Sequence, residues 1–294
     1  MKLGILVGEF TKTMSLKDAI GLAKKIGYTC VEIPAYDTNG KGNQYEPESA
    51  RKIFTWARNI GLEISSFQCH TGYSGPDWKK NMEHTKKMMD IAQYTGVDIV
   101  HTVSGPLPSV DVHRQWLKGT EEIAKTPAWA NIVQVYRELC EYAKSTGIKL
   151  AIEPVFVYMV CNYETTKKLF EDLGKENLYI NLDPSHFPYQ REDVIPFIRD
   201  FGKRIVHCHV KDGLVQKENP AEIEKGDAFS MGNGEQFKFA APGKGVLDWK
   251  AIISALKEIG YNYVLSLEMG HGYEGKPEDI ARDNLKFFDN LLKR

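Results

Sequence analysis

The sequence predicts a closed (β/α)8 TIM barrel, in which eight parallel strands are surrounded by helices. Three observations predict it: a helix–strand phrase that recurs along the chain, a strict alternation of apolar runs with amphipathic helices, and a length of 294 residues. Alternating strands and helices are typical of a parallel sheet. Because α/β barrels commonly form one domain of about 250 residues, we expect a single domain over residues 1–294.

The recurring phrase consists of a helix, a glycine and, one residue later, an apolar run. It reads KKIGYTCVEI around Gly27 and returns as RNIGLEISSF, QYTGVDIVHTV, KSTGIKLAIEP and KEIGYNYVLSLE, around Gly61, Gly96, Gly147 and Gly260. Glycine adopts the left-handed conformation that ends a helix without steric cost. Each repeat therefore predicts the end of a helix followed by a strand.

The eight strands and helices follow from this phrase and from hydrophobic periodicity. The first strand is expected over residues 3–7, five more follow the glycines of the phrase, and LYINLD and RIVHCHV supply the other two. The helices are expected over residues 16–26, 47–60, 78–95, 127–146, 163–174, 193–202, 248–260 and 277–292. No GxGxxG follows the first strand, which disfavours an open dinucleotide-binding sheet.

Two connections are longer than the barrel requires. One follows the fourth strand and reads SGPLPSVDVHRQWLKGTEEIAKTP, and the other covers residues 213–243 after the seventh strand. Both lie on the carboxyl side of a strand, where barrel enzymes build their active sites. Because long loops in compact domains are often functional, we expect residues 213–243 to form an insertion that acts as a lid.

Composition narrows the class of protein. The formal net charge is −1 and no long basic tract occurs, so we expect neither a nucleic-acid nor a membrane partner. The five cysteines form no CxxC pair, which is typical of buried thiols in a reducing compartment. The beginning of the chain reads as a strand rather than a signal peptide. We therefore expect a cytoplasmic protein.

Four consecutive strands end in residues that can bind a metal. Glu153 ends the fifth strand in LAIEP, Asp183 the sixth in INLDPSH, His209 the seventh in HCHVKD, and Glu268 the eighth in LSLEMGH. One such residue would be an ordinary polar group at a strand end. In four successive repeats they form a ring, and bare carboxylates in a ring would repel one another. A divalent cation that accepts carboxylate and imidazole ligands explains the arrangement.

The motifs IEP, DPSH, HCHVKD, GKGVLDW and LEMGH resemble those of the xylose-isomerase-like barrels. This superfamily includes sugar isomerases, ketose 3-epimerases, inosose dehydratases and endonuclease IV. The resemblance covers essentially the whole chain and is more specific for the superfamily than for a substrate. It implies one divalent metal, Mn²⁺ before Co²⁺, Mg²⁺ or Zn²⁺, a carbohydrate substrate and a homo-oligomer, with a partner subunit as the alternative.

The resemblance also implies roles for the two glutamates. In ketose 3-epimerases of this type, two glutamates are both metal ligands and acid–base groups on opposite sides of the substrate. Carried over, Glu153 and Glu268 take these roles. The metal would polarise a ketone and stabilise an enediolate, while one carboxylate removes the neighbouring proton and the other returns it.

Six further polar residues near the strand ends are candidates for the site. We expect substrate contacts from His186, His70, His101 and Lys211, and positions beside the metal ligands for His207 and Asp212. Simpler interpretations stay open. His186 could be a structural loop residue, and His207 could pack in the barrel core. Lys211 could pair with Asp212 or with an acid of the barrel.

Several functions compete with an isomerase or epimerase. The same metal and bases could expel a β-leaving group, which would make the protein a lyase or dehydratase of a 3-keto-glycoside or an inosose. An endonuclease IV-like nuclease is disfavoured for two reasons. That enzyme carries an Asp-x-His pair between its seventh and eighth strands, whereas residues 213–247 contain no histidine. The chain also lacks the cluster of basic residues expected of a DNA-binding protein. A barrel that only binds a ligand is disfavoured by the intact set of metal ligands.

Overall fold

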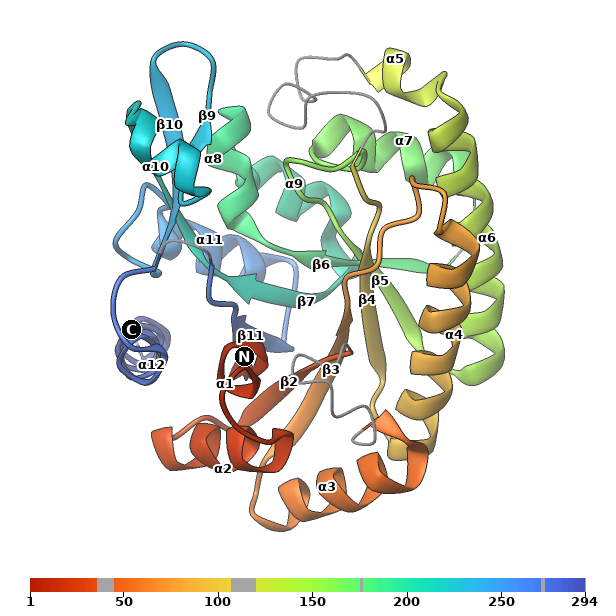
Figure 1. The fold of residues 1–294 in the computed structure, drawn as a ribbon, viewed down its shortest axis with the longest axis vertical. Helices are drawn as coiled ribbons and strands as arrows, with labels where there is room; N and C mark the ends of the chain where they lie inside the picture. The colour runs from red at the N-terminus through yellow and green to blue at the C-terminus, as the bar shows by residue number, and fades with distance from the viewer. Residues whose placement is uncertain (36–44, 107–119, 175–176, 271–272, 294) are drawn as a thin grey trace.

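The computed structural model describes residues 1–35, 45–106, 120–174, 177–270 and 273–293, and eight of its strands close into the expected parallel barrel (Figure 1). The strands are β1 (Lys2–Leu6), β2 (Cys30–Pro34), β3 (Glu63–Cys69), β4 (Ile99–Val103), β5 (Lys149–Glu153), β6 (Leu178–Leu182), β7 (Ile205–Val210) and β11 (Val264–Leu267). They follow one another around the barrel in chain order, and β11 closes it by pairing with β1. The predicted fold class is confirmed.

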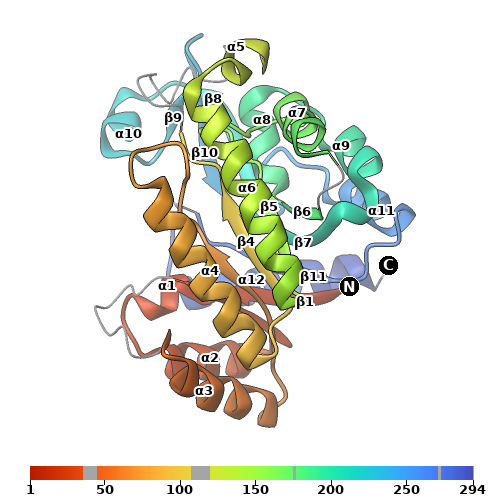
Figure 2. The same ribbon diagram turned by 90° about the vertical axis from the view of Figure 1, so that its right-hand side faces the viewer.

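The eight expected helices are all present, and no boundary differs from the expectation by more than two residues. They are α2 (Leu16–Ile26), α3 (Pro47–Asn59), α4 (Trp78–Thr95), α6 (Pro127–Thr146), α7 (Tyr163–Leu173), α9 (Val194–Phe201), α11 (Trp249–Glu258) and α12 (Pro277–Leu292). Seen from the side, α4 and α6 run next to each other along the outside of the barrel (Figure 2). Among the described residues, no helix is long and apolar enough to cross a membrane.

The glycines of the recurring phrase end their helices as predicted. Gly27 follows α2 with a φ of 119°, and Gly147 follows α6 with a φ of 73°. The amide of each donates to carbonyl groups in the preceding turn. A side chain at these positions would strain the backbone. The helix ends are therefore fixed locally, which explains why the sequence predicts them so closely.

The insertion after β7 folds as a second, antiparallel sheet, which the sequence did not predict. It contains β8 (Asp212–Lys217), β9 (Phe229–Ser230), β10 (Glu235–Ala240) and the short helix α10 (Pro220–Lys225). This sheet lies on one side of the barrel, beside α8 (Phe187–Gln190), at the upper left of Figure 1. Of the other long connection, residues 107–119 lie outside the described residues, and α5 (Thr120–Ala124) follows them.

Two kinds of packing surround the strands. The main hydrophobic core lies between the strands and the outer helices and includes Leu16, Phe54, Val100 and Leu256. Inside the barrel, the half nearer the carboxyl ends of the strands is polar instead. Fully buried side chains there are Glu32, Ser66, His101, Asn181, His207, His209 and Ser266. Buried polar groups need partners, and these groups form the floor of the site described next.

Candidate metal centre and active site

The four predicted metal ligands meet at the carboxyl ends of the strands. Glu153 ends β5, Asp183 follows β6, His209 lies in β7 and Glu268 follows β11. Each offers one nitrogen or oxygen atom, and these four atoms all lie within 4.8 Å of one another. Glu153, Asp183 and His209 are buried, and the side chain of Glu268 is 13% exposed. The structure thus brings together a compact set of three carboxylates and one imidazole, which we call the metal cluster.

The donor set fits a divalent cation. Oδ2 of Asp183 is buried without a hydrogen-bond partner, although Nζ of Lys211 lies 3.0 Å away outside hydrogen-bonding geometry. The same Nζ lies 2.6 Å from Oε2 of Glu268. One ammonium group therefore faces a cluster of three carboxylates. Oxygen and imidazole donors of this kind bind Mn²⁺, Mg²⁺, Co²⁺ or Zn²⁺.

The pKa values of the two glutamates in the cluster are lowered, which favours their ionised forms. Burial alone would raise the pKa of Glu153, but the charge of His209 and hydrogen bonds from neighbouring histidines hold this pKa well below its usual range. For Glu268, burial is likewise outweighed by the charges of Lys211 and His209, so its pKa is also lowered. Ionised carboxylates are the form that binds metals and accepts protons.

Two of the predicted substrate-binding residues flank Glu153. Nε2 of His70 lies 3.2 Å from Glu153 Oε2, and Nε2 of His186 lies 3.3 Å from Glu153 Oε1. His70 follows β3 and is 24% exposed, whereas His186 is buried and its Nδ1 has no hydrogen-bond partner. Both histidines therefore face the cluster, and their contact with substrate stays a prediction.

Lys211 pairs with acids of the barrel, one of the alternatives left open by the sequence. Its ammonium group lies between Asp183 and Glu268 and over the ring of Phe239, 4.4 Å from the ring centre. These contacts leave Lys211 buried at the edge of the metal cluster. A contact with a substrate hydroxyl stays a prediction.

Asp212 makes its side-chain hydrogen bonds around the two ends of the insertion, and its expected position beside the metal ligands stays a prediction. Its carboxylate accepts hydrogen bonds from the amides of Gly213, Gly243 and Leu247 and from the indole of Trp249. These partners belong to the start of the insertion and to the GKGVLDW motif. Asp212 thus fastens the ends of the insertion together, because it accepts four hydrogen bonds there, two of them fully buried.

His101 and His207 lie in a layer below the metal cluster. His101 is inside β4 rather than after it, and it is fully buried. Nδ1 of His207 lies 2.9 Å from Asn181 Oδ1, and its Nε2 lies 3.2 Å from Ser66 Oγ. His207 is therefore packed in the barrel interior beside a cluster ligand. The predicted contact of His101 with substrate stays untested.

Two further buried polar residues, which are not among the site residues expected above, contact the metal cluster. Glu32 in β2 is fully buried, and its carboxylate contacts His101 and His209. Asn181 in β6 is also fully buried and donates to Oε2 of Glu153 over 2.8 Å. A charge within the apolar run CVEIP was a signal for Glu32. Asn181 gave no such signal, because one neutral polar residue in a strand is common.

Aromatic side chains close one side of the site. Phe156, after β5, packs with Tyr189, Phe237 and Phe239 of α8 and β10. The ring centres of Phe156 and Phe239 lie 5.4 and 5.8 Å from that of His186. These aromatic contacts hold the insertion beside His186, next to the metal cluster.

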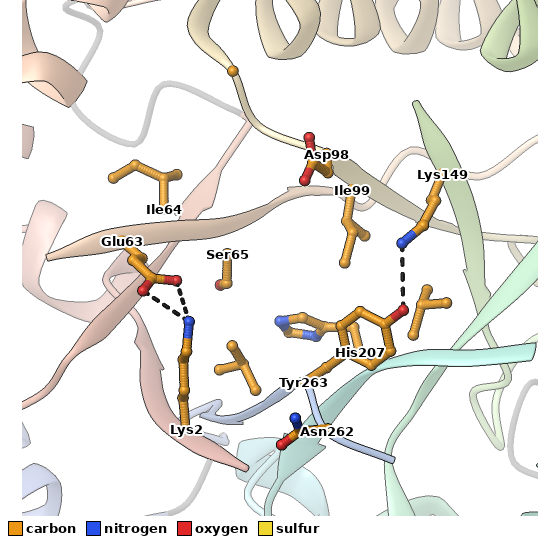
Figure 3. Close-up of a pocket in the computed structure, with 13 residues that line it drawn as sticks. Lys2, Glu63, Ile64, Ser65, Asp98, Ile99, Lys149, His207, Asn262 and Tyr263 are labelled. Carbon is orange, nitrogen blue, oxygen red and sulfur yellow. Dashed lines mark hydrogen bonds and ion pairs between the residues drawn. The ribbon is translucent and has the colours of Figure 1, made fainter. Parts of the chain in front are cut away.

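A cavity of about 170 Å³ opens at the opposite, amino end of the strands (Figure 3). Its charges pair with each other or face solvent: Lys2 bonds to Glu63, and Lys149 reaches the hydroxyl of Tyr263. His207 forms its inner end. Of the residues that line the cavity, His207 alone belongs to a group of metal-ligating side chains within the part of the chain that the structure describes. The four predicted metal ligands thus lie at the opposite end of the strands from this cavity.

Comparison with known proteins assigns the chain to a family. The pattern of the family described as "Xylose isomerase-like TIM barrel" matches residues 20–291. The chain belongs to this family. The family match spans every strand from β2 to β11, and it includes all four residues of the metal cluster.

Two curated relatives resemble this family member along most of its length. An inosose isomerase of Bacillus velezensis is 26% identical over 276 residues, which cover 92% of this chain and 88% of the relative. An inosose dehydratase of Mesomycoplasma hyopneumoniae is 24% identical over 286 residues, which cover 97% of this chain and 91% of the relative. The two relatives carry different reaction names, so similarity alone does not select the reaction.

Solved structures share the fold. The crystal structure of an IOLI protein with a bound zinc atom superimposes with a TM-score of 0.74, covers 99% of this chain and 98% of its own, and is 22% identical. An L-ribulose 3-epimerase superimposes with a TM-score of 0.72, covers 99% of this chain and 94% of its own, and is 18% identical. At these identities the match establishes the barrel fold alone.

Proposed function

We propose that the protein is a divalent-metal-dependent sugar isomerase or epimerase that moves a proton next to the carbonyl of a keto-sugar. The observation that carries the proposal is the metal cluster, in which two ionised glutamates share a compact site with an aspartate and a histidine. A bound cation would supply positive charge beside a carbonyl oxygen, which acidifies the adjacent C–H. Glu153, Asp183, His209 and Glu268 would hold it.

The two glutamates lie in different surroundings, which suits two proton-transfer roles. Glu153 is 1% exposed and is held by Asn181, His70 and His186. Glu268 is 13% exposed and is held by Gln68 and Lys211. In the proposed reaction one carboxylate accepts the proton and the other returns one from the opposite face.

The experiment combines metal content with proton exchange. The purified protein is analysed for bound metal, and then inosose and a panel of ketoses are incubated with it in D₂O and followed by NMR. We expect deuterium at a carbon next to the carbonyl. Glu153→Gln and Glu268→Gln should each slow this exchange by about 10²–10⁴-fold, the usual contribution of an acid–base group.

Glu63→Gln is the matched control, because Glu63 is an exposed glutamate at the other end of the barrel. It should leave exchange and metal content unchanged. The proposal is wrong if both cluster variants keep full exchange, or if the wild-type protein takes up no Mn²⁺. Uptake of several zinc ions together with cleavage of DNA would favour the nuclease instead.

A dehydratase is the second candidate, and the similarity to an inosose dehydratase over 97% of the chain supports it. The first step would be the same proton removal, followed by loss of a hydroxyl group from the next carbon. Lys211 at the edge of the cluster could then donate a proton to the departing oxygen. Product mass separates the two candidates, because an isomer keeps the mass of the substrate and a dehydration product loses one water.

We further propose Mn²⁺ as the native metal and a homo-oligomeric assembly. The mixed carboxylate and imidazole set supports Mn²⁺, although the same donors accept Zn²⁺. Elemental analysis of protein purified without added metal tests the first proposal, and sedimentation equilibrium tests the second. Zinc in the purified protein would contradict the first, and a monomer at micromolar concentration the second.

A further inference from the structure

Glu32 is a fully buried carboxylate directly below the metal cluster. Its Oε1 lies 2.5 Å from Nε2 of His101 and 3.0 Å from Nε2 of His209, and its Oε2 lies 2.6 Å from the hydroxyl of Ser266. Among the described residues no lysine or arginine forms an ion pair with it. A buried carboxylate is costly without strong partners. The imidazole and hydroxyl groups around Glu32 are therefore its stabilising contacts.

The amide of Asn181 indicates which imidazole nitrogens carry hydrogen. Its Nδ2 faces Oε2 of Glu153 at 2.8 Å, so this end of the amide is the donor. Its Oδ1 must then accept from Nδ1 of His207, 2.9 Å away. The hydroxyl of Ser66 can donate to the remaining nitrogen of that ring, Nε2, over 3.2 Å. His207 is thereby satisfied without Glu32, and Nε2 of His207 lies 3.7 Å from that carboxylate.

The same amide faces two further histidines. Its Nδ2 lies 3.3 Å from Nδ1 of His101 and equally far from Nδ1 of His209. When the second amide hydrogen is donated to His101, Nδ1 of that ring accepts and its Nε2 carries the hydrogen. That hydrogen points to Glu32, 2.5 Å away. Glu32 thus accepts from His101 and Ser266 and has one further close imidazole neighbour, His209.

The two nitrogens of the His209 ring face two different layers. Nδ1 lies 3.2 Å from Oε2 of Glu153 and 3.4 Å from Oε2 of Glu268, within the metal cluster. Nε2 lies 3.0 and 3.2 Å from the two oxygens of Glu32. If Nε2 carries the hydrogen and donates it to Glu32, the lone pair of Nδ1 is free and faces the other three residues of the metal cluster.

We propose that Glu32 is a positioning residue that accepts the Nε2–H of His209 and so directs Nδ1 of this histidine toward the bound metal. The inference rests on the proposed metal centre and adds a residue that acts through one of its ligands. Carboxylate partners of this kind orient metal-binding histidines and raise their basicity. Glu32 itself is no ligand, because its oxygens already accept from three donors below the cluster.

The alternative is a second metal between Glu32, His101, His207 and His209, which also form a compact group. Such a metal would require Nε2 of His209 without its hydrogen. It would also have to displace the hydrogen bonds that satisfy Glu32 and His207. The two arrangements differ in which nitrogen of His209 carries hydrogen, and this difference can be measured.

The first experiment compares metal affinity in Glu32→Gln, Ser66→Ala and the wild-type protein by calorimetric titration with Mn²⁺. Glu32→Gln should raise the Kd for metal by about 10–100-fold, the usual effect of losing such a partner. Ser66→Ala is the matched control, since Ser66 is equally buried in the same layer but bonds to His207 rather than His209. Glu32→Asp, which keeps the charge, should recover part of the affinity.

The second experiment needs no variant and stands even if Glu32→Gln does not fold. Long-range ¹H–¹⁵N NMR spectra of the zinc-loaded wild-type protein should show His209 with hydrogen on Nε2 and metal on Nδ1. Metal on Nε2, or a Kd changed less than about threefold in a folded Glu32→Gln protein, would overturn the inference. Wild-type protein that binds no metal would instead reject the proposed metal centre.

Discussion

The two ends of the barrel carry the same ion pair in different environments. At the amino end, Lys2 and Glu63 meet at 2.6 Å with side chains 51% and 63% exposed. At the carboxyl end, Lys211 and Glu268 also meet at 2.6 Å but are 6% and 13% exposed. Water screens the first pair, whereas the second is shielded from it. Charges separated from water shift pKa values and can bind metal, so burial rather than residue type distinguishes the end that holds the candidate metal centre.

The strongest test of this comparison removes each lysine in turn. Lys211→Met leaves Asp183 and Glu268 buried without their ammonium partner and should lower the free energy of unfolding by about 3–5 kcal/mol. Lys2→Met removes an exposed partner and should leave the unfolding midpoint unchanged. Urea unfolding in EDTA measures both. Equal effects for the two variants would contradict the comparison.

Added metal should stabilise the protein through residues at the carboxyl end of the barrel and not through those at the amino end. Mn²⁺ at a hundredfold excess over its Kd should raise the free energy of unfolding of the wild-type protein by about 2.7 kcal/mol, because it binds only the folded chain. His209→Ala should lose this gain. The substitution Lys149→Ala, at the amino end, is the control and should keep it. Equal stabilisation of the wild-type and His209→Ala proteins would place the metal elsewhere.

The substitution Asp212→Asn tests whether a buried carboxylate at the carboxyl end stabilises the fold in the absence of metal. In Asp212→Asn, one oxygen is replaced by an NH₂ group that faces N–H donors of the GKGVLDW segment. Each donor left without a partner should cost about 1–3 kcal/mol of stability. Thermal unfolding in EDTA and calorimetric Kd values for Mn²⁺ separate the two effects. A large change in the Kd for Mn²⁺ without a change in stability would show that Asp212 supports metal binding rather than the fold.

The smallest effect is expected at the amino end. Tyr263→Phe removes a hydroxyl that lies 3.4 Å from Nζ of Lys149, and the tyrosine is 40% exposed. Solvent replaces this contact, so the free energy of unfolding should change by less than about 0.5 kcal/mol. Urea unfolding measures it. A loss as large as that of Lys211→Met would show that the cavity in Figure 3 is as sensitive as the metal cluster.

Sequence predicted most successfully where structure is set locally. The helix ends follow from glycines such as Gly27 and Gly147, whose positive φ depends on the residue itself. The convergence of the four cluster residues was also predictable, because the same strand position in successive repeats reaches the same height of a barrel. The antiparallel sheet of the insertion was not predictable, since Phe237 and Phe239 pack against Phe156, which is far away in the sequence.

By itself, the sequence determined the barrel, the order of its elements and the four residues that meet at its carboxyl end. Tertiary structure alone decided which groups lie around them. It placed Glu32 under His209, turned Asp212 toward backbone amides, and set Lys211 between two carboxylates. The physical reason is that strand repeats specify height along the barrel, whereas hydrogen bonds and ion pairs depend on which strands become neighbours across its interior.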